Sequence, residues 1–273
     1  MEPRLQRRVQ RYGWDLAADD YEPLWQAQLA PAQAELLAQV ALAPGERVLD
    51  VACGTGLVTL PAARAVGPHG RVLGVDISER MVQTTLHRAR AEQLHQVDAA
   101  RMDAEQLALP DAGFDVALCA FGLMYLPEPE QALRELRRVL RPGGRLGLAI
   151  WGERARCGWS ALFPIVDAEV TSEVCPLFFR LGQADTLVRL CAQAGFNDMQ
   201  TMRISTTLRY THADDACRAA FVGGPVALAW SRMDEAARER VSAAYLQAID
   251  GWRTGAGYAV PAEFLISTAT SPS

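Results

Sequence analysis

The chain has 273 residues, half of them hydrophobic and 22% charged, which is typical of a globular protein with a sizeable core and excludes a disordered chain. Its formal net charge is −5 and it contains no lysine, so it has no basic field for a phosphate backbone, and we expect no nucleic-acid partner. Residues 1–10 are polar and Arg-rich, and no apolar run reaches the roughly 20 residues that span a bilayer. We therefore expect a cytoplasmic protein without stable membrane insertion.

Six cysteines are spread along the chain without a CxxC pair, and Cys and His are not clustered at the short spacings of zinc ligands. In a chain of this size they indicate reduced, mostly buried thiols, and we expect no metal site. The cysteines are Cys53, Cys119, Cys157, Cys175, Cys191 and Cys217.

Residues 4–40 carry apolar side chains near helical spacing, which predicts helices. Pro23 and Pro31 are expected to divide this segment, because proline breaks helix interiors and is favoured at helix starts. A turn at Pro44-Gly45 follows. We predict a helical N-terminal cap over residues 1–43.

Residues 44–151 alternate between β-rich runs and amphipathic runs of helical spacing. This alternation predicts βαβ units, a parallel sheet and right-handed crossovers. The predicted strands are 47–52, 71–77, 96–100, 114–120 and 145–151, and the predicted helices are 57–66, 79–92 and 130–140.

Residues 152–273 are harder to interpret. We predict a mixed aromatic stretch at 152–183, a helix at 184–194, a strand at 198–210, helices over 214–252 with a break at Gly223-Gly224-Pro225, and a last strand at 262–268. The fold class is α/β: one unit with a doubly wound, mostly parallel seven-stranded sheet, a helical N-terminal cap and a C-terminal helical insertion.

A glycine turn, Cys53-Gly54-Thr55-Gly56, ends the first predicted strand and opens a helix, so its backbone can approach a ligand closely. Asp76 ends the second strand, where a carboxylate can bind a ribose diol. This layout also suits NAD, although the dinucleotide fingerprint needs a third glycine and Thr59 stands there. Asp50 would repel a pyrophosphate and attract a cation such as S-adenosylmethionine, or it only organises the loop; the two roles can coexist.

Four stretches in order resemble the motifs of class I S-adenosylmethionine-dependent methyltransferases, a Rossmann-like family. They are LDVACGTG at 49–56, GVDIS at 74–78, DAEQLALP at 103–110 running into FDV at 114–116, and RVLRPGGRL at 138–146. FGLMY at 121–125 resembles an FGLRN-like segment of the ubiquinone/menaquinone C-methyltransferase-like (methyltransferase type 11) group, with Met124-Tyr125 in place of Arg-Asn.

The resemblance implies S-adenosylmethionine as cofactor. Thr55 and the glycine backbone would hold its methionine end, Asp76 its ribose, and Asp103 the adenine amino group. Ile77 and Met81 would flank the adenine, and Tyr21 would close over the cofactor, although all three could equally be core residues. Ala120 stands where the quinone enzymes have a serine. The implied cofactor-binding residues are Tyr21, Asp50, Cys53, Gly54, Thr55, Gly56, Asp76, Ile77, Met81, Asp103, Ala104, Ala120 and Phe121.

Methyl transfer from a sulfonium has a good neutral leaving group, so the protein chiefly aligns and desolvates the reactants. A phenolic acceptor could also need a base; Tyr125 and His212 are the candidates for a catalytic role. The region 152–260 is expected to form an acceptor pocket with aromatic walls. The aromatic candidates for these walls are Trp151, Trp159, Phe163, Phe178, Phe221 and Trp230.

These patterns predict a methyltransferase that acts by C- or O-methylation on a small apolar or aromatic acceptor. Two alternatives remain: a non-catalytic S-adenosylmethionine-binding protein and an NAD-dependent oxidoreductase. A homodimer is compatible with the sequence.

Overall fold

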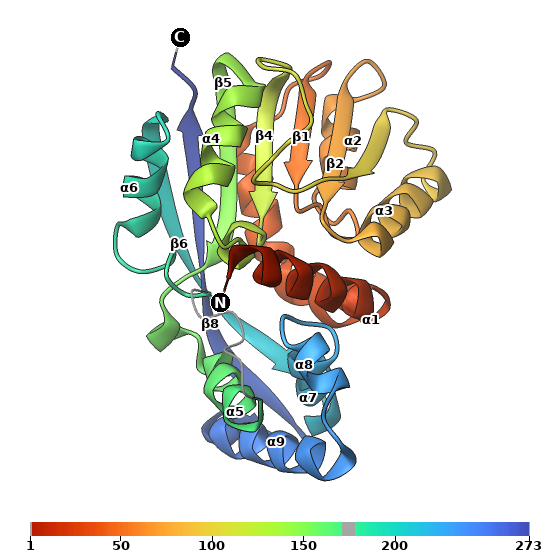
Figure 1. The fold of residues 1–273 in the computed structure, drawn as a ribbon, viewed down its shortest axis with the longest axis vertical. Helices are drawn as coiled ribbons and strands as arrows, with labels where there is room; N and C mark the ends of the chain where they lie inside the picture. Colours follow the sequence, from red (N-terminus) through yellow and green to blue (C-terminus); the bar gives the residue numbers. More distant parts are fainter. Residues whose placement is uncertain (1, 171–177, 273) are drawn as a thin grey trace.

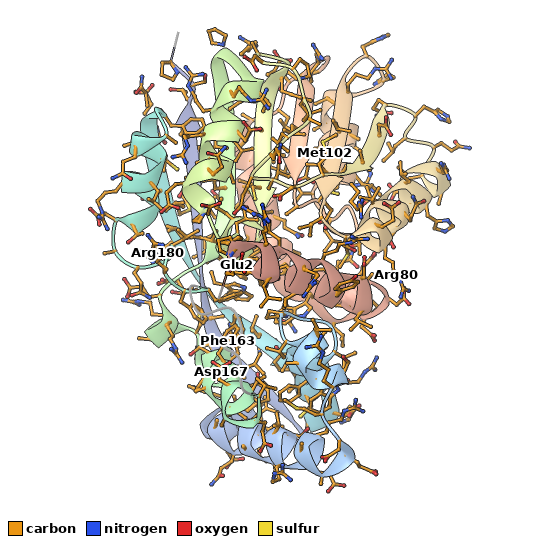
Figure 2. All side chains as sticks on the ribbon, viewed as in Figure 1. Glu2, Arg80, Met102, Phe163, Asp167 and Arg180 are labelled. Carbon is orange, nitrogen blue, oxygen red and sulfur yellow. The ribbon has the colours of Figure 1, made fainter. Side chains whose placement is uncertain are left out.

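A computed structural model describes residues 2–170 and 178–272. A twisted central sheet has helices on both faces, and the long helix α1 (Pro3–Val40) crosses between the sheet and a second group of helices (Figure 1). Side chains fill the space between these layers, with Phe163 projecting from the second group and Met102 lying beside the strands of the sheet (Figure 2).

Five strands form the parallel part of the sheet in the order β3-β2-β1-β4-β5. They are β1 (Arg47–Val51), β2 (Arg71–Asp76), β3 (Val97–Arg101), β4 (Phe114–Ala120) and β5 (Leu140–Trp151). The helices α2 (Thr59–Val66), α3 (Glu79–Ala91) and α4 (Pro129–Val139) connect them. The strand order reverses between β1 and β4, and this is the point at which open α/β sheets bind ligands. The predicted Rossmann-like, doubly wound α/β fold is confirmed.

The last two long strands make an antiparallel ribbon. β8 (Gly257–Thr270) pairs antiparallel with β5 and with β6 (Asn197–Tyr210). β5 ends where Trp151 pairs with Phe264, but β6 and β8 stay paired as far as Tyr210 and Tyr258. The ribbon therefore extends well beyond the carboxyl edge of the parallel strands (Figure 1).

Helices pack around the extended ribbon on the far side of α1 (Figure 1). They are α5 (Leu162–Glu169), α7 (Ala213–Phe221), α8 (Ala227–Ser231) and α9 (Glu235–Ala248), while α6 (Thr186–Gln193) contacts α4. The short turns η1 (Leu123–Tyr125), η2 (Arg154–Arg156), η3 (Gly158–Ala161) and η4 (Asp250–Trp252) connect elements. α1 thus lies between the carboxyl edge of the sheet and this helical lobe.

Two sequence predictions are corrected. Pro23 and Pro31 do not divide the N-terminal segment, because α1 runs through both. An internal proline costs roughly 3 kcal/mol, but α1 buries Trp25, Leu29 and Leu36 on one face, and this packing outweighs the local preference. The described sheet also has eight strands rather than seven: β7 (Arg253–Thr254) adds to β8 and is too short to show an alternating pattern.

The expectations about cysteines, metal sites and membrane-spanning segments can be compared with the described residues. There, Cys53, Cys119, Cys157 and Cys191 are free and buried, and Cys217 is free and partly buried, whereas Cys175 lies outside the described range. No group of three or more His, Cys, Asp or Glu within residues 2–170 and 178–272 is arranged to hold a metal ion. Over the same ranges, no helix is both long and apolar enough to cross a bilayer.

Candidate functional site

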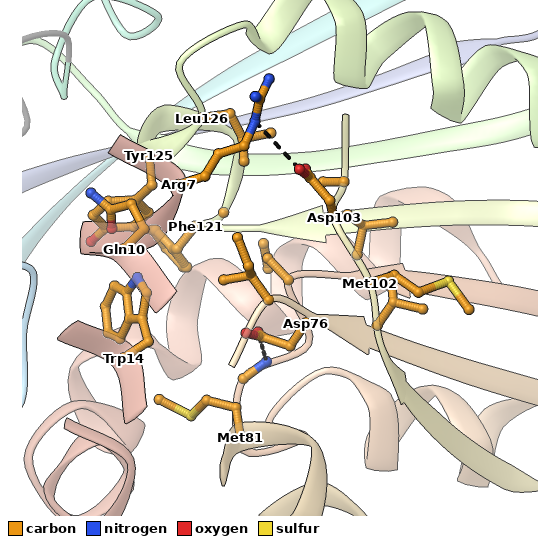
Figure 3. A pocket seen from close by; sticks show the side chains of 18 of the residues that line it. Arg7, Gln10, Trp14, Asp76, Met81, Met102, Asp103, Phe121, Tyr125 and Leu126 are labelled. Carbon is orange, nitrogen blue, oxygen red and sulfur yellow. Dashed lines mark hydrogen bonds and ion pairs between the residues drawn. The ribbon is translucent and has the colours of Figure 1, made fainter. Parts of the chain in front are cut away.

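A cavity of about 750 Å³ lies at the carboxyl ends of β1, β2 and β4, covered by α1 (Figure 3). It is therefore at the point where the strand order reverses. Ten residues singled out in the sequence line it: Tyr21, Gly54, Asp76, Ile77, Met81, Asp103, Ala104, Ala120, Phe121 and Tyr125.

The glycine turn after β1 forms one wall. Gly54 and Gly56 have φ of 55° and 86°, a region that glycine adopts without strain. The Gly54 N–H donates to Asp76 Oδ2 and the Ser78 N–H donates to Asp76 Oδ1, both at 2.9 Å. Two backbone amides thus fix the Asp76 carboxylate against the turn. Figure 3 draws one of these two hydrogen bonds.

Burial raises the pKa of two carboxyl groups next to this turn. Desolvation raises the pKa of Asp76 to about 6, although the hydrogen bonds from Ser78 and Gly54 oppose the rise. Desolvation likewise raises the pKa of Asp50 to about 7, and the nearby Asp76 charge adds to the rise. A cation bound beside them would favour the charged form of both groups.

Four of the predicted residues lie behind the cavity wall rather than on it. Asp50 is buried under the turn, where Thr59 Oγ1 donates to its Oδ2 at 2.6 Å. This bond joins β1 to the start of α2, and both predicted roles of Asp50 stay predictions. Thr55 is fully buried, and its Oγ1 has no partner among the described residues. The four residues absent from the lining are Asp50, Cys53, Thr55 and Gly56.

Asp103 follows β3 and is held from two sides. Its Oδ1 accepts from the Glu105 N–H at 2.9 Å, and its Oδ2 lies 3.3 Å from Arg7 Nε of α1 (Figure 3). Arg7 also pairs with the buried carboxylate of Glu105, and with Glu128 at 2.9 Å. Arg7 therefore connects the covering helix to the loop after β3.

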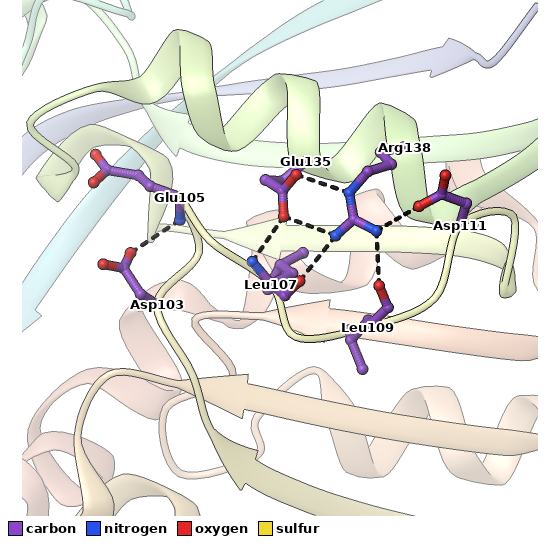
Figure 4. A network of polar contacts seen from close by, with 7 residues as sticks. All are labelled: Asp103, Glu105, Leu107, Leu109, Asp111, Glu135 and Arg138. Carbon is purple, nitrogen blue, oxygen red and sulfur yellow. Dashed lines mark hydrogen bonds and ion pairs between the residues drawn. The ribbon is translucent and has the colours of Figure 1, made fainter.

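Arg138 of α4 braces the same loop further along (Figure 4). Its guanidinium donates to the carbonyl oxygens of Leu107 at 2.9 Å and Leu109 at 2.7 Å. It also pairs with Glu135 at 2.8 Å and Asp111 at 2.7 Å. The first residue of the RVLRPGGRL motif thus has a structural role: it fixes the backbone that presents Asp103.

Sequence reasoning missed the contribution of α1 to this site. Arg7, Gln10 and Trp14 line the cavity with Tyr21. Their spacings of three, four and seven residues put them on one helical face, and Figure 3 shows Arg7, Gln10 and Trp14 successively along α1. This spacing was the available signal, but the Arg-rich composition around Arg7 resembles an exposed helix.

A second chamber of about 330 Å³ adjoins the cavity on the side of the helical lobe. Four aromatic residues line both spaces: Trp14, Tyr21, Phe121 and Tyr125. The chamber alone is lined by Trp25, Leu29, Trp151, Trp159, Gly224 and Pro225.

Only some of the predicted aromatic walls and catalytic candidates lie here. Trp151 and Trp159 line the chamber, whereas Phe163, Phe178, Phe221 and Trp230 do not; the first two of these four pack against Trp159 instead. Tyr125 lies at the junction of the two spaces. His212 lines neither and begins α7, where its N–H donates to Asp215 Oδ2 at 3.0 Å in a capping box. His212 is therefore the N-cap residue of α7.

The residues around the larger cavity fit an adenosine-containing cation. Its lining is mostly apolar with a few polar groups, as in small-molecule sites. Asp76 beside backbone amides suits a ribose diol, Asp103 suits an amino group, and Ile77 and Met81 offer apolar contacts. A Cβ at Gly54 would lie 3.8 Å from Tyr21 Cε1, so the bare glycine leaves a cradle under this ring.

Comparison with known proteins gives likenesses to methyltransferases over part of the chain. Residues 48–144 match a family model described as "Methyltransferase domain". A demethylmenaquinone methyltransferase of Listeria welshimeri is 38% identical over 119 residues, covering 44% of this chain and 50% of that protein. The chain thus spans half the length of the curated Listeria relatives that it matches.

Solved structures share the fold over most of the chain. One is the structure of a Bacillus halodurans protein that is described as a candidate methyltransferase. It covers 88% of this chain and 99% of its own length, at 20% identity and a TM-score of 0.64. The [4+2]-cyclase SpnF covers 91% of this chain and 83% of its own, at 25% identity and a TM-score of 0.57.

The matches favour neither an NAD-dependent oxidoreductase nor a non-catalytic binding protein. Residues 48–144 thus match a methyltransferase domain, and the motif order and strand topology of the chain resemble those of the class I S-adenosylmethionine-dependent methyltransferases, with likeness to the menaquinone C-methyltransferase-like group over 119 residues.

Proposed function

We propose that this chain is an enzyme that transfers the methyl group of S-adenosylmethionine to a small, apolar or aromatic molecule, by C- or O-methylation. The observation that carries the proposal is that the cavity at the switch point and the second chamber share part of their lining. A methyl donor in the first space and an acceptor in the second would meet at Trp14, Tyr21, Phe121 and Tyr125.

The proposed cofactor contacts follow from the charges and hydrogen bonds of the larger cavity. Asp76, fixed by two backbone amides, binds the ribose hydroxyls. Asp103, fixed by Arg7 and Glu105, accepts from the adenine amino group, with Ala104 beside it. Asp50 supports the turn from behind, and Thr55 is the buried residue within the turn. Tyr21 and Trp14 cover the site from α1 and exclude water.

When bound, S-adenosylmethionine supplies an electrophilic methyl group and leaves as a neutral thioether. The work of the protein is then to hold the acceptor in line and to keep water away. The described residues that line the chamber include no carboxylate, guanidinium or imidazole group, and their titratable groups are Tyr21 and Tyr125. Burial and the Asp76 charge raise the pKa of Tyr21, so its hydroxyl stays protonated near neutral pH and does not act as a base.

Tyr125 is the proposed contact to the acceptor near the reacting atom. It lies at the junction of the two spaces, with its ring 5.1 Å from Trp14 and 5.2 Å from Phe178. This position supports a role in orienting the acceptor. The demethylmenaquinone methyltransferase relatives carry a name that refers to an aromatic acceptor, which agrees with the apolar walls.

The test is a turnover assay with S-adenosylmethionine and two acceptor sets: bicyclic phenols and hydroquinones, and polar amines such as histamine. Formation of S-adenosylhomocysteine and of a methylated product should require the aromatic set. Methylation of the polar set alone would contradict the proposed acceptor class. Binding of S-adenosylmethionine without turnover of either set would instead favour a non-catalytic binding protein.

A further inference from the structure

Two tryptophans that line the second chamber have indole N–H groups without hydrogen-bond partners in the part of the chain that the structure describes. Among the described residues, the buried indole nitrogens Trp25 Nε1 and Trp159 Nε1 have no acceptor. Trp25 is 5% exposed and Trp159 2%, so both rings are shielded from bulk solvent. Buried indole N–H groups usually find an acceptor, because an unmet donor costs free energy. Two of them on one small chamber require an explanation.

The two donors belong to neighbouring rings from different elements. Trp25 comes from α1 and Trp159 from η3, and their ring centroids are 6.2 Å apart at an angle of 66°. Trp151 packs against both, at 6.0 Å and 4.8 Å. A Cβ at Gly224 would lie 3.8 Å from Trp25 Nε1, and Gly224 is itself part of the chamber wall. Trp25 Nε1 therefore lies beside Gly224 of the chamber wall.

The chemistry of the lining defines what these donors can bind. The described lining holds no Arg, Lys or His for a carboxylate or phosphate, and no Asp or Glu for an ammonium group. A neutral N–H donor surrounded by aromatic rings is suited to an uncharged oxygen, such as that of a ketone, quinone or phenol.

We propose that Trp25 and Trp159 determine acceptor specificity by donating hydrogen bonds to an uncharged oxygen of an aromatic or bicyclic acceptor. This inference rests on the proposed function, in that it assigns the chamber to the acceptor. Both residues line the chamber but not the cofactor cavity. The oxygen that they bind is therefore an anchor, separate from the atom that receives the methyl group at the Tyr125 side.

The test compares two uncharged bicyclic probes that differ in one carbonyl: 1-tetralone, which accepts a hydrogen bond, and tetralin, which does not. Their binding to the full chain is measured by equilibrium dialysis, with and without S-adenosylhomocysteine. Trp25→Phe and Trp159→Phe should each weaken 1-tetralone binding by about three- to tenfold and change tetralin binding by less than about twofold.

Leu29→Val is the matched control, because Leu29 lines the same chamber and has no polar side-chain atom. It should change the binding of both probes by the same factor. Calorimetric binding of S-adenosylhomocysteine checks the fold of each variant, since neither tryptophan lines the cofactor cavity. If a phenylalanine variant fails to fold, benzothienylalanine at that position keeps the fused rings and removes only the N–H.

An equal loss of both probes in the tryptophan variants, no change in either, or no binding of either probe to the wild type would overturn the inference. Failure of the proposed function is seen separately. It would appear as an absence of S-adenosylhomocysteine binding or of turnover, while the difference between the two probes is measured without any reaction.

Discussion

Arg7 Nε of α1 lies 3.3 Å from Asp103 Oδ2, so the helix that covers the cavity and the loop after β3 are joined by an ion pair at the cavity itself. The same guanidinium pairs with Glu105, whose carboxylate is 4% exposed. Removing one partner of a buried pair leaves an uncompensated charge. Arg7 therefore has a larger role than an exposed arginine of the same helix.

The first prediction follows from this ion pair. Arg7→Ala should weaken S-adenosylmethionine binding by about tenfold, because Asp103 loses its partner and α1 loses an anchor over the site. Isothermal titration measures the change. Arg8→Ala is the control: Arg8 is the next residue and is exposed, and its loss should leave the affinity unchanged. Equal affinities of the two variants would show that Arg7 does not position Asp103.

The second prediction concerns the ribose contact. Asp76→Ala removes a charged acceptor that two backbone amides hold in place. Loss of such hydrogen bonds is worth about 1.5–3 kcal/mol, so the affinity for S-adenosylmethionine should fall by roughly tenfold to a hundredfold. Asp185→Asn, at an exposed residue that pairs with Arg189, is the control and should bind like the wild type. Wild-type affinity in the Asp76 variant would remove this residue from the site.

The third prediction is a pH dependence of cofactor binding. Burial raises the pKa of Asp76 to about 6, and the charged form is the one that a ribose diol and a nearby cation favour. The affinity should therefore be full near pH 8 and fall as the pH drops, with Asp76 alone contributing up to about tenfold per pH unit below 6. Asp50, with a pKa of about 7, acts in the same direction. Titrations from pH 5 to 8 measure the slope, and Asp76→Asn should flatten it; a slope unchanged in this variant would exclude Asp76 as its cause.

The fourth prediction tests the close approach of the two loops at the switch point. A Cβ at Gly122 would lie 2.3 Å from Ala52 Cβ, so Gly122→Ala must push the loops after β4 and β1 apart. Overpacking of this kind costs about 1–3 kcal/mol of unfolding free energy. Gly251→Ala is the control, since nothing lies within 4 Å of a Cβ there. Urea unfolding of the two variants compares them; equal stabilities would mean that the loops can separate freely.

The core of the fold could be predicted because local pattern and tertiary environment agree there. The apolar runs around Asp50, Asp76 and Ala120 are buried on both faces of a parallel sheet, and such strands are hydrophobic throughout. The predicted strand 114–120 has the same bounds as β4. Pro142, Gly143 and Gly144, which lie between the predicted helix 130–140 and the predicted strand 145–151, are instead part of β5. The Gly143 N–H donates to the Ser271 carbonyl and the Ser271 N–H donates to the Gly144 carbonyl, across 127 residues of sequence or more. A local pattern does not contain such a partner.

Some residues of the candidate site could likewise be predicted from the sequence, and others could not. Asp76 stands out in the sequence because it ends a strand and Asp103 because it begins a stretch that resembles a family motif, and both line one cavity in the structure. Their contacts with the cofactor stay predictions. The covering face of α1 could not be identified, because the prolines suggested separate helices and Arg7 lies in a run of arginines. The pairing of Trp25 with Trp159 depends on how α1 and η3 pack, which no local spacing encodes.

The central claim is that the cavity at the switch point binds S-adenosylmethionine. Isothermal titration of the purified chain with S-adenosylmethionine, S-adenosylhomocysteine and NAD, in parallel and at pH 8, tests it most directly. We predict binding of the first two ligands in the micromolar range and none of NAD. Binding of NAD alone, or of none of the three, would contradict the assignment of this cavity.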